Sequence, residues 1–313
     1  MEKGEDEANQ GAIIRTLFGS GGFFILRRDN LKFVPFRKFL IGLFFLLFTI
    51  HYSPFTVSCA AETPKRIISL APNITEILFT LGLGDRVVGV TSFCDFPEEA
   101  KNKPKIGGMS NPSLEAVVSL KPDIVVMTTD GNPKEFEERL RAMKIRTYVF
   151  RATRLSELPQ GVRGLGGALG VKEKAEEFAK TAEAALNNFK SQAVNRRSQK
   201  KILFIVWPEP LVAAGPGTVI DDAINLIGAE NMAAKTKTSY PKYSIEEIVR
   251  RPPDIIFIGR GVGMEKVSQG LLNRLKNLPV VKNGRVFYVG DYLYRLGPRT
   301  IKGIGEISSL IEK

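Results

Sequence analysis

One sequence pattern that occurs twice without a gap constrains the fold of this 313-residue chain more than any other feature. Residues 113–126 read SLEAVVSLKPDIVV and residues 244–257 read SIEEIVRRPPDIIF, with Ser, Glu, Val, Pro and Asp at the same offsets. A serine at this place is typical of a helix N-cap, and the Pro-Asp corner separates the short helix from a buried strand. The repeat therefore predicts two lobes of related design.

Short β-type runs alternate with amphipathic helical stretches through the rest of the chain after residue 62. The expected strands share a high content of β-branched residues and cover 66–69, 87–91, 123–127, 146–150, 201–206, 254–258 and 285–289. Helical patterns lie between several of them, at 74–83, 133–143 and 301–311. This alternation predicts an α/β fold with mostly parallel sheets.

One segment interrupts the alternation between the two repeats. From residue 172 to about residue 197 the chain has neither Gly nor Pro, and its apolar residues recur every three or four positions. The spacing predicts one amphipathic helix of about 25 residues, about 38 Å long. We therefore expect a first lobe over 62–170, a stiff connecting helix over 171–198 and a second lobe over 199–313.

Residues 1–61 are expected to be an N-terminal extension followed by an export signal. Arg37 and Lys38 precede an apolar run over 39–50, and small residues follow at 56–61. This order is typical of a cleaved secretory signal, and a retained anchor is the alternative. Ser58 and Ala60 suit simple cleavage, whereas Cys59 would be the first residue of a lipid-anchored protein. The expected location is the periplasm or the outer face of the cytoplasmic membrane.

Composition excludes several classes of site. The two cysteines, Cys59 and Cys94, are too few for a disulfide framework or a four-cysteine zinc site, and the single histidine, His51, belongs to the expected export segment. Histidine metal centres and histidine-dependent triads are then excluded. The net charge of +12 comes from scattered basic residues, which does not indicate a nucleic-acid partner. Cys94 is expected to be a buried, inert thiol.

The chain resembles a known family at several motifs. These are RIISLAPNITE at 66–76, GVTSFCDFP at 89–97, the two repeated segments, and GPR at 297–299. Together they resemble the cobalamin and iron-siderophore substrate-binding proteins of ABC importers, over essentially all of 64–313. The resemblance implies two Rossmann-like lobes bridged by a rigid helix, with the ligand between them and little closure on binding. It further implies a monomer without a cofactor, which docks on a membrane permease and its ATPase.

The resemblance also implies two sets of site residues. The permease-docking acids would be Glu115 and Glu246, one in each repeat, although an acid in the first turn also stabilises a helix without any partner. Ligand-binding residues are expected in loops at the carboxyl ends of strands. They are Phe93, Met109, Trp207, Tyr240, Asp291 and Arg295. Trp207 is an equally good core residue. The Asp291–Arg295 spacing matches an acid and a base that contact the ligand in the cobalamin-binding relative, and a local ion pair is the alternative.

The sequence leaves more than one ligand and more than one function class open. Cobalamin is favoured, although Met109, Thr129 and Tyr240 stand where the resembling cobalamin protein has tryptophans. A siderophore or haem would suit arginines, namely Arg260, Arg295 and Arg299. The competing class is a two-lobed glycosyltransferase, which needs a phosphate loop or a general base. The Gly-rich segments 164–170 and 259–263 lack the GxGxxG spacing, so we expect a binding protein and no enzyme.

Overall fold

The computed structural model describes residues 63–194, 200–261 and 263–312, together with the backbone of three strands near the N-terminus. The chain divides into two compact units, Met1–Glu62 and Thr63–Lys313. In the first unit, β1 (Thr16–Gly19), β2 (Gly22–Arg27) and β3 (Asn30–Pro35) form an antiparallel sheet that the sequence pattern did not predict. The expected export signal, with His51 and Cys59, lies outside the described residues.

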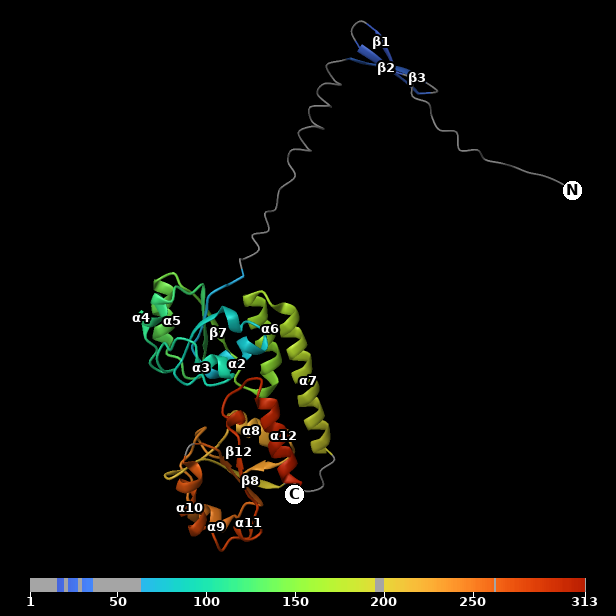
Figure 1. Ribbon diagram of the computed structural model, residues 1–313. Coiled ribbons are helices and arrows are strands. Elements are labelled where there is room, and N and C mark those ends of the chain that lie inside the picture. The colour runs from blue at the N-terminus through green and yellow to red at the C-terminus, as the bar shows by residue number, and fades with distance from the viewer. Residues whose placement is uncertain are drawn as a thin grey trace, which may run out of the picture. The chain divides into compact units, whose positions relative to one another are not determined.

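The first lobe of the second unit is a parallel α/β layer structure (Figure 1). Its sheet has the order β5-β4-β6-β7, formed by β4 (Ile67–Ser69), β5 (Val87–Val90), β6 (Ile124–Thr128) and β7 (Arg146–Phe150). Its helical segments are α2 (Pro72–Thr80), η1 (Gly84–Arg86), α3 (Glu98–Lys101), α4 (Leu114–Ser119), α5 (Lys134–Ala142), η2 (Leu155–Glu157) and α6 (Leu158–Leu169). The predicted strands of this half are confirmed.

The second lobe repeats the parallel arrangement with an added edge. The order is β10-β8-β11-β12, with β9 antiparallel to β8, and the strands are β8 (Lys201–Pro208), β9 (Leu211–Ala213), β10 (Glu230–Asn231), β11 (Ile255–Gly259) and β12 (Val286–Val289). The helical segments are α8 (Val219–Leu226), α9 (Ile245–Arg250), α10 (Met264–Arg274), α11 (Pro279–Lys282), η3 (Asp291–Leu293) and α12 (Thr300–Ile311). The α/β class is confirmed, while the short β9 and β10 were missed.

The repeated segment has the same role in both lobes. Ser113 caps α4 by accepting the backbone N–H of residue 116, and Ser244 caps α9 in the same way. The carboxylate of Asp123 accepts the backbone N–H of Arg66 at 2.8 Å, and that of Asp254 accepts the backbone N–H of Lys201 at 2.7 Å. Each aspartate thereby connects the start of its own strand to the start of the neighbouring strand.

The long helix α7 (Lys172–Val194) runs beside both lobes (Figure 1). It begins at the predicted residue, and residues 195–199 lie outside the described residues. It packs against α6 of the first lobe and against α8 and α12 of the second. Arg163 of α6 reaches two acids of α7, Glu176 at 2.7 Å and Glu183 at 2.5 Å. The helix is therefore fixed along its length to both halves of the unit.

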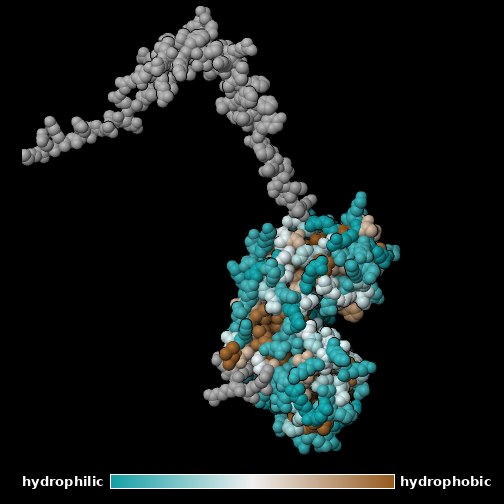
Figure 2. Space-filling model, turned by 180° about the vertical axis from the view of Figure 1, so that it is seen from behind, coloured by the Kyte–Doolittle hydropathy of each residue, from teal (hydrophilic) through white to brown (hydrophobic). Residues whose placement is uncertain are grey.

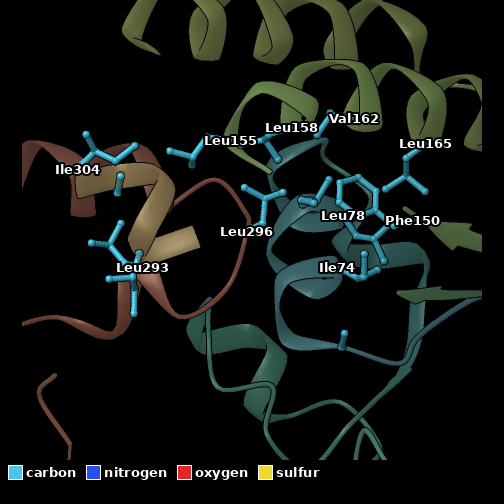
Figure 3. Packing of buried hydrophobic residues seen from close by; sticks show 14 of the residues in the cluster. Ile74, Leu78, Phe150, Leu155, Leu158, Val162, Leu165, Leu293, Leu296 and Ile304 are labelled. Carbon is cyan, nitrogen blue, oxygen red and sulfur yellow. The ribbon is translucent and has the colours of Figure 1, made fainter. Parts of the chain in front are cut away.

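One hydrophobic core cluster spans both lobes, and each lobe has a further cluster of its own. A single cluster of buried side chains includes Ile74 and Phe150 of the first lobe, Leu158 of α6, and Leu293 and Ile304 of the second lobe. Figure 3 shows Leu155, Leu158 and Leu296 between the residues of the two lobes. Separating the lobes would expose this apolar surface, so the fold opposes large hinge motion. No helix within the described residues has the length and hydropathy needed to cross a membrane.

Candidate functional site

A cleft between the lobes is lined by loops that follow the strands of both sheets. Its cavity has a volume of about 280 Å³. The first lobe contributes Pro72, Asn73, Met109, Thr128, Thr129, Asp130, Ala152 and Thr153. The second lobe contributes Gly217, Thr218, Val219, Ser239, Tyr240, Tyr294, Arg295 and Leu296. Ligands of open α/β sheets bind at these carboxyl ends, so the position agrees with the expectation from the sequence.

Asn132 holds the loops of the first lobe together at the cleft. Its side-chain amide donates to the backbone carbonyl of Leu70 and to that of Met109, each at 2.9 Å, while its Oδ1 accepts the N–H of Thr128 at 2.8 Å. One side chain thus joins the ends of β4 and β6 to the turn that carries Met109. Asn132 could not be found from the sequence, because a lone Asn in a loop gives no signal of three tertiary hydrogen bonds.

Met109 lies against the backbone of Gly131. A Cβ on Gly131 would lie 3.0 Å from the Met109 Cε, and the φ of Gly131 is +95°. Both observations favour glycine at this position, since a side chain would press on Met109 and strain the turn. The end of the Met109 side chain therefore fills the space beside Gly131 at the cleft wall.

Two tyrosines of the second lobe line the opposite wall. Tyr240 is 51% exposed, whereas the Tyr294 ring packs edge-on against Phe204 at 6.1 Å. Partial burial of its ring raises the pKa of Tyr240, and the charge of Asp130 from the first lobe adds to this effect. Burial is also the main cause of the raised pKa of Tyr294. Both phenols are therefore protonated well above neutral pH, and both rings offer aromatic surface at the cleft wall.

The lining of the cleft contains two charged side chains, Asp130 from the first lobe and Arg295 from the second. The Nη1 of Arg295 is buried and has no hydrogen-bond partner among the residues that the structure describes. A buried guanidinium donor without a partner is costly, so the Arg295 side chain gains by turning its guanidinium toward an acidic or carbonyl group of a ligand in the cleft. This atom is the clearest indication of ligand chemistry in the cleft.

Three of the six predicted ligand-binding residues, Met109, Tyr240 and Arg295, line the cavity. Phe93 is 57% exposed and lies beside the Gly107–Met109 turn, where its Cε2 would be 3.5 Å from a Cβ on Gly108. Trp207 is 47% exposed at the end of β8, and its Nε1 donates to the carbonyl of Glu209 at 2.7 Å. Phe93 and Trp207 do not line the cavity itself.

Asp291 does not line the cavity, and among the described residues it forms no ion pair with Arg295, the alternative considered from the sequence. Its carboxylate lies 3.4 Å from Arg299, and this ion pair replaces the local pair with Arg295 that the four-residue spacing suggested. Arg299 in turn contacts Glu76 of the first lobe, so its donors are already engaged. Arg260 is exposed and donates to the carbonyl of Tyr288. Of the three arginines considered for an acidic ligand, Arg295 is the one that lines the cleft.

Comparison with known proteins agrees with this architecture. Residues 67–293 match the family described as periplasmic binding protein. The chain belongs to the periplasmic binding protein family. The predicted resemblance and the assignment to the substrate-binding proteins of ABC transporters are thereby confirmed, and the relatives named below are binding proteins.

Three relatives illustrate the similarity. The ABC transporter substrate-binding lipoprotein YvrC of Bacillus subtilis (strain 168) is 33% identical over 80% of this chain and 81% of that protein. The vitamin B12-binding protein of Vibrio parahaemolyticus serotype O3:K6 (strain RIMD 2210633) is 28% identical over 82% of this chain and 93% of that protein. The apo structure of the periplasmic heme-binding protein RhuT from Roseiflexus sp. RS-1 is 29% identical, covers 79% of this chain and 97% of that chain, and superposes with a TM-score of 0.72.

The two proposed docking acids occupy matching positions in this periplasmic binding protein. Glu115 is the second residue of α4 and Glu246 is the second residue of α9, and both side chains are exposed. Each follows a serine cap, so each also lies favourably at the positive end of its helix. Their role toward a permease stays a prediction.

A larger cavity of about 870 Å³ lies on the helical side of the periplasmic binding protein. Its walls come from η2, α6, α7 and α8, with apolar residues such as Leu155, Leu186 and Leu226. Figure 2 shows hydrophobic residues gathered at the waist of the unit on this face. Arg154 and Asp222 at its edge already form an ion pair at 2.5 Å. It lacks the strand-end loops and the unpartnered donor of the cleft, which is therefore the better ligand site.

Cys94 lies in the shared core and is 2% exposed. Its thiol is 3.1 Å from the hydroxyl of Thr75 and 3.1 Å from that of Thr91. The expected burial of this thiol is confirmed, and its inertness stays a prediction. In the part of the chain that the structure describes, no group of three or more His, Cys, Asp and Glu residues is placed to hold a metal ion.

Proposed function

We propose that this substrate-binding protein captures a bulky metal chelate, cobalamin or another corrinoid in the first place, and delivers it to a membrane permease and its ATPase. The observation that carries the proposal is the cleft at the carboxyl ends of both sheets. It combines the aromatic faces of Tyr240 and Tyr294, the thioether of Met109 and the unpartnered Nη1 of Arg295. A large flat ligand needs such apolar faces with a few polar groups at its edge.

The proposed ligand is larger than the cavity and would have to extend beyond it. About 280 Å³ is slightly below the roughly 300–1,000 Å³ of pockets that enclose drug-sized ligands. A macrocyclic chelate would therefore be held partly outside the cavity. The exposed rings of Phe93 and Trp207 would offer apolar surface to the protruding part, and both residues stay in the proposed ligand-binding set.

A haem or ferric-siderophore ligand is the second candidate. Arg295 favours it, because the carboxylates of a haem or the acidic groups of a siderophore would pair with the free guanidinium donor. One relative of comparable identity is named a periplasmic heme-binding protein, and another is named a vitamin B12-binding protein. In either case we propose transport without catalysis, by an exported monomer that is either cleaved before the mature domain or lipid-anchored at Cys59.

Ligand titration of the purified full chain tests the proposal. Trp207 is the single tryptophan and is half-exposed, so its fluorescence would be quenched by a light-absorbing chelate bound at the cleft. Hydroxocobalamin, haemin and a ferric hydroxamate are each added, and equilibrium dialysis confirms the dissociation constant. Saturable binding of hydroxocobalamin is expected. Saturable binding of haemin or the hydroxamate alone would replace it with the second candidate, and no binding of any probe would contradict the proposal.

One matched pair of variants tests the role of the guanidinium. Arg295→Gln is expected to weaken binding by about tenfold or more, since the ligand loses a charge-assisted hydrogen bond. Arg260→Gln removes an exposed arginine of the same lobe that does not line the cavity. Equal affinities of the two variants would show that Arg295 does not contact the ligand.

A further inference from the structure

An ion pair between two motif residues connects the lobes next to the cleft. Glu76 lies on α2 of the first lobe, and Arg299 immediately precedes α12 of the second lobe. Arg299 donates from Nε to Oε2 of Glu76 at 3.0 Å and from Nη2 to Oε1 at 2.6 Å. The side chain of Glu76 is 5% exposed and that of Arg299 is 18% exposed. This is a bidentate, largely desolvated contact between residues 223 positions apart in the chain.

The surroundings of Arg299 fix its guanidinium further. The group lies 4.5 Å from the ring centroid of Phe96 in the first lobe and 5.2 Å from that of Tyr292 in the second. Its Nη1 lies 3.4 Å from Asp291. Cation–π contacts on two rings and a second carboxylate hold the side chain in one position. Arg299 is therefore unsuited to contact a ligand directly.

The same turn carries the cleft wall. The hydroxyl of Thr300 donates to the carbonyl of Arg295 and accepts the N–H of Gly297, both at 2.9 Å. The side-chain amide of Asn73, one helical turn before Glu76, donates to the carbonyl of Leu296 at 3.2 Å. The cleft-lining segment 294–296 is therefore hydrogen-bonded to Thr300, the residue after Arg299, and to Asn73 of α2.

We infer that Arg299 is a positioning residue: by clamping Glu76 across the lobes, it fixes the cleft-lining segment 294–296 and so holds Arg295 in its place at the cleft wall. The inference rests on the proposed function for the identity of the ligand. Arg299 would then determine ligand affinity without contacting the ligand. The clamp acts on the cleft side of the unit, whereas α7 fixes the lobes through α6, α8 and α12.

Two measurements on the full chain test the inference. Hydrogen exchange followed by mass spectrometry reports on the backbone of 294–300, and equilibrium dialysis with hydroxocobalamin and haemin reports on affinity. Arg299→Lys and Glu76→Gln are expected to speed exchange in 294–300 and to weaken binding by about tenfold. The double variant Glu76→Gln/Arg299→Gln leaves no buried charge without its partner, and it is expected to show the same two changes if a single variant does not fold.

Arg163→Lys is the matched control, because Arg163 also makes a bidentate pair, with Glu176, but on the α6–α7 face. It is expected to keep exchange in 294–300 and affinity within about twofold of wild type. The inference is overturned if the variants of Arg299 and Glu76 keep wild-type affinity, or if Arg163→Lys loses as much. If the wild-type protein binds neither probe, the proposed function fails, and exchange alone decides the inference: unchanged exchange overturns it.

Discussion

Gly259 and Tyr294 are in such close contact that a Cβ on the glycine would lie 1.6 Å from the phenolic oxygen of the tyrosine. Gly259 is the last residue of β11, and Tyr294 lines the cleft. The missing side chain therefore provides the space in which the phenol lies against the sheet. The glycine that looked like part of a weak phosphate-loop pattern instead admits an aromatic wall residue.

Gly259→Ala is expected to displace the Tyr294 phenol. The overlap forces either the ring or the end of β11 to move, and such overpacking costs about 1–3 kcal/mol in the free energy of unfolding. Because the ring forms part of the cleft wall, ligand affinity is expected to fall by about tenfold as well. Urea denaturation and equilibrium dialysis with hydroxocobalamin and haemin measure the two effects.

Gly270→Ala is the matched control for this change. A Cβ on Gly270, within α10, would meet nothing within 4 Å. Alanine favours a helix by up to about 1 kcal/mol over glycine, so this variant is expected to be as stable as wild type or more stable. Wild-type affinity and stability in Gly259→Ala would contradict the role given to the glycine.

Asn132→Ala is expected to loosen the loops of the first lobe. The variant leaves the carbonyls of Leu70 and Met109 and the N–H of Thr128 without their side-chain partner, which costs about 1–3 kcal/mol in the free energy of unfolding. Thermal and urea denaturation give the value. Asn273→Ala, at an exposed site in α10, is expected to stay within about 0.5 kcal/mol of wild type. Equal stability of the two variants would contradict the bracing role.

The parallel sheets could be predicted from sequence because short β-type runs alternate with amphipathic helical stretches along the chain. The repeated segments also gave the helix caps and the strand starts, since Ser113 and Ser244 bond to backbone only three residues away. The weak strands β9 and β10 could not be predicted in this way. They have three and two residues and are defined by pairing with β8 rather than by their own composition.

The site could be predicted only in part, for a related reason. Met109, Tyr240 and Arg295 follow from the rule that loops after parallel strands face the ligand. The ion-pair partner of Asp291 could not be predicted from the sequence. The four-residue spacing suggested Arg295, whereas Glu76 of the first lobe holds Arg299 beside Asp291. Contacts between residues more than 200 positions apart leave no local pattern in the chain.

Acid is expected to weaken the contact between α6 and α7. Hydrogen bonds from Arg163 are the main cause of the lowered pKa of both Glu176 and Glu183, relative to the ordinary value of 4.5. A carboxylate whose pKa is lowered by folding stabilises the protein above its ordinary pKa. That stabilisation is lost as the pH falls through the lowered value. The melting temperature is therefore expected to fall more steeply below about pH 4.5 in wild type than in Glu176→Gln/Glu183→Gln.

A melting series between about pH 3 and pH 7 measures this difference. Glu138→Gln is the control, because it changes an exposed acid of α5 that lies 3.9 Å from Lys134. Its melting curve is expected to follow wild type at each pH. A double variant at Glu176 and Glu183 that parallels wild type through the acid range would contradict the role given to Arg163.

Glu115→Ala/Glu246→Ala is expected to separate transport from binding. Both acids are exposed on the second residue of a short helix and lie outside the cleft lining, so ligand affinity is expected to stay within about twofold of wild type. Uptake of the bound chelate, measured in cells that carry the matching permease and ATPase, is expected to be lost. Glu135→Ala/Glu265→Ala removes first-turn acids from α5 and α10, one in each lobe, and is expected to leave uptake unchanged. Normal uptake in the first double variant would show that these helix starts do not contact the permease.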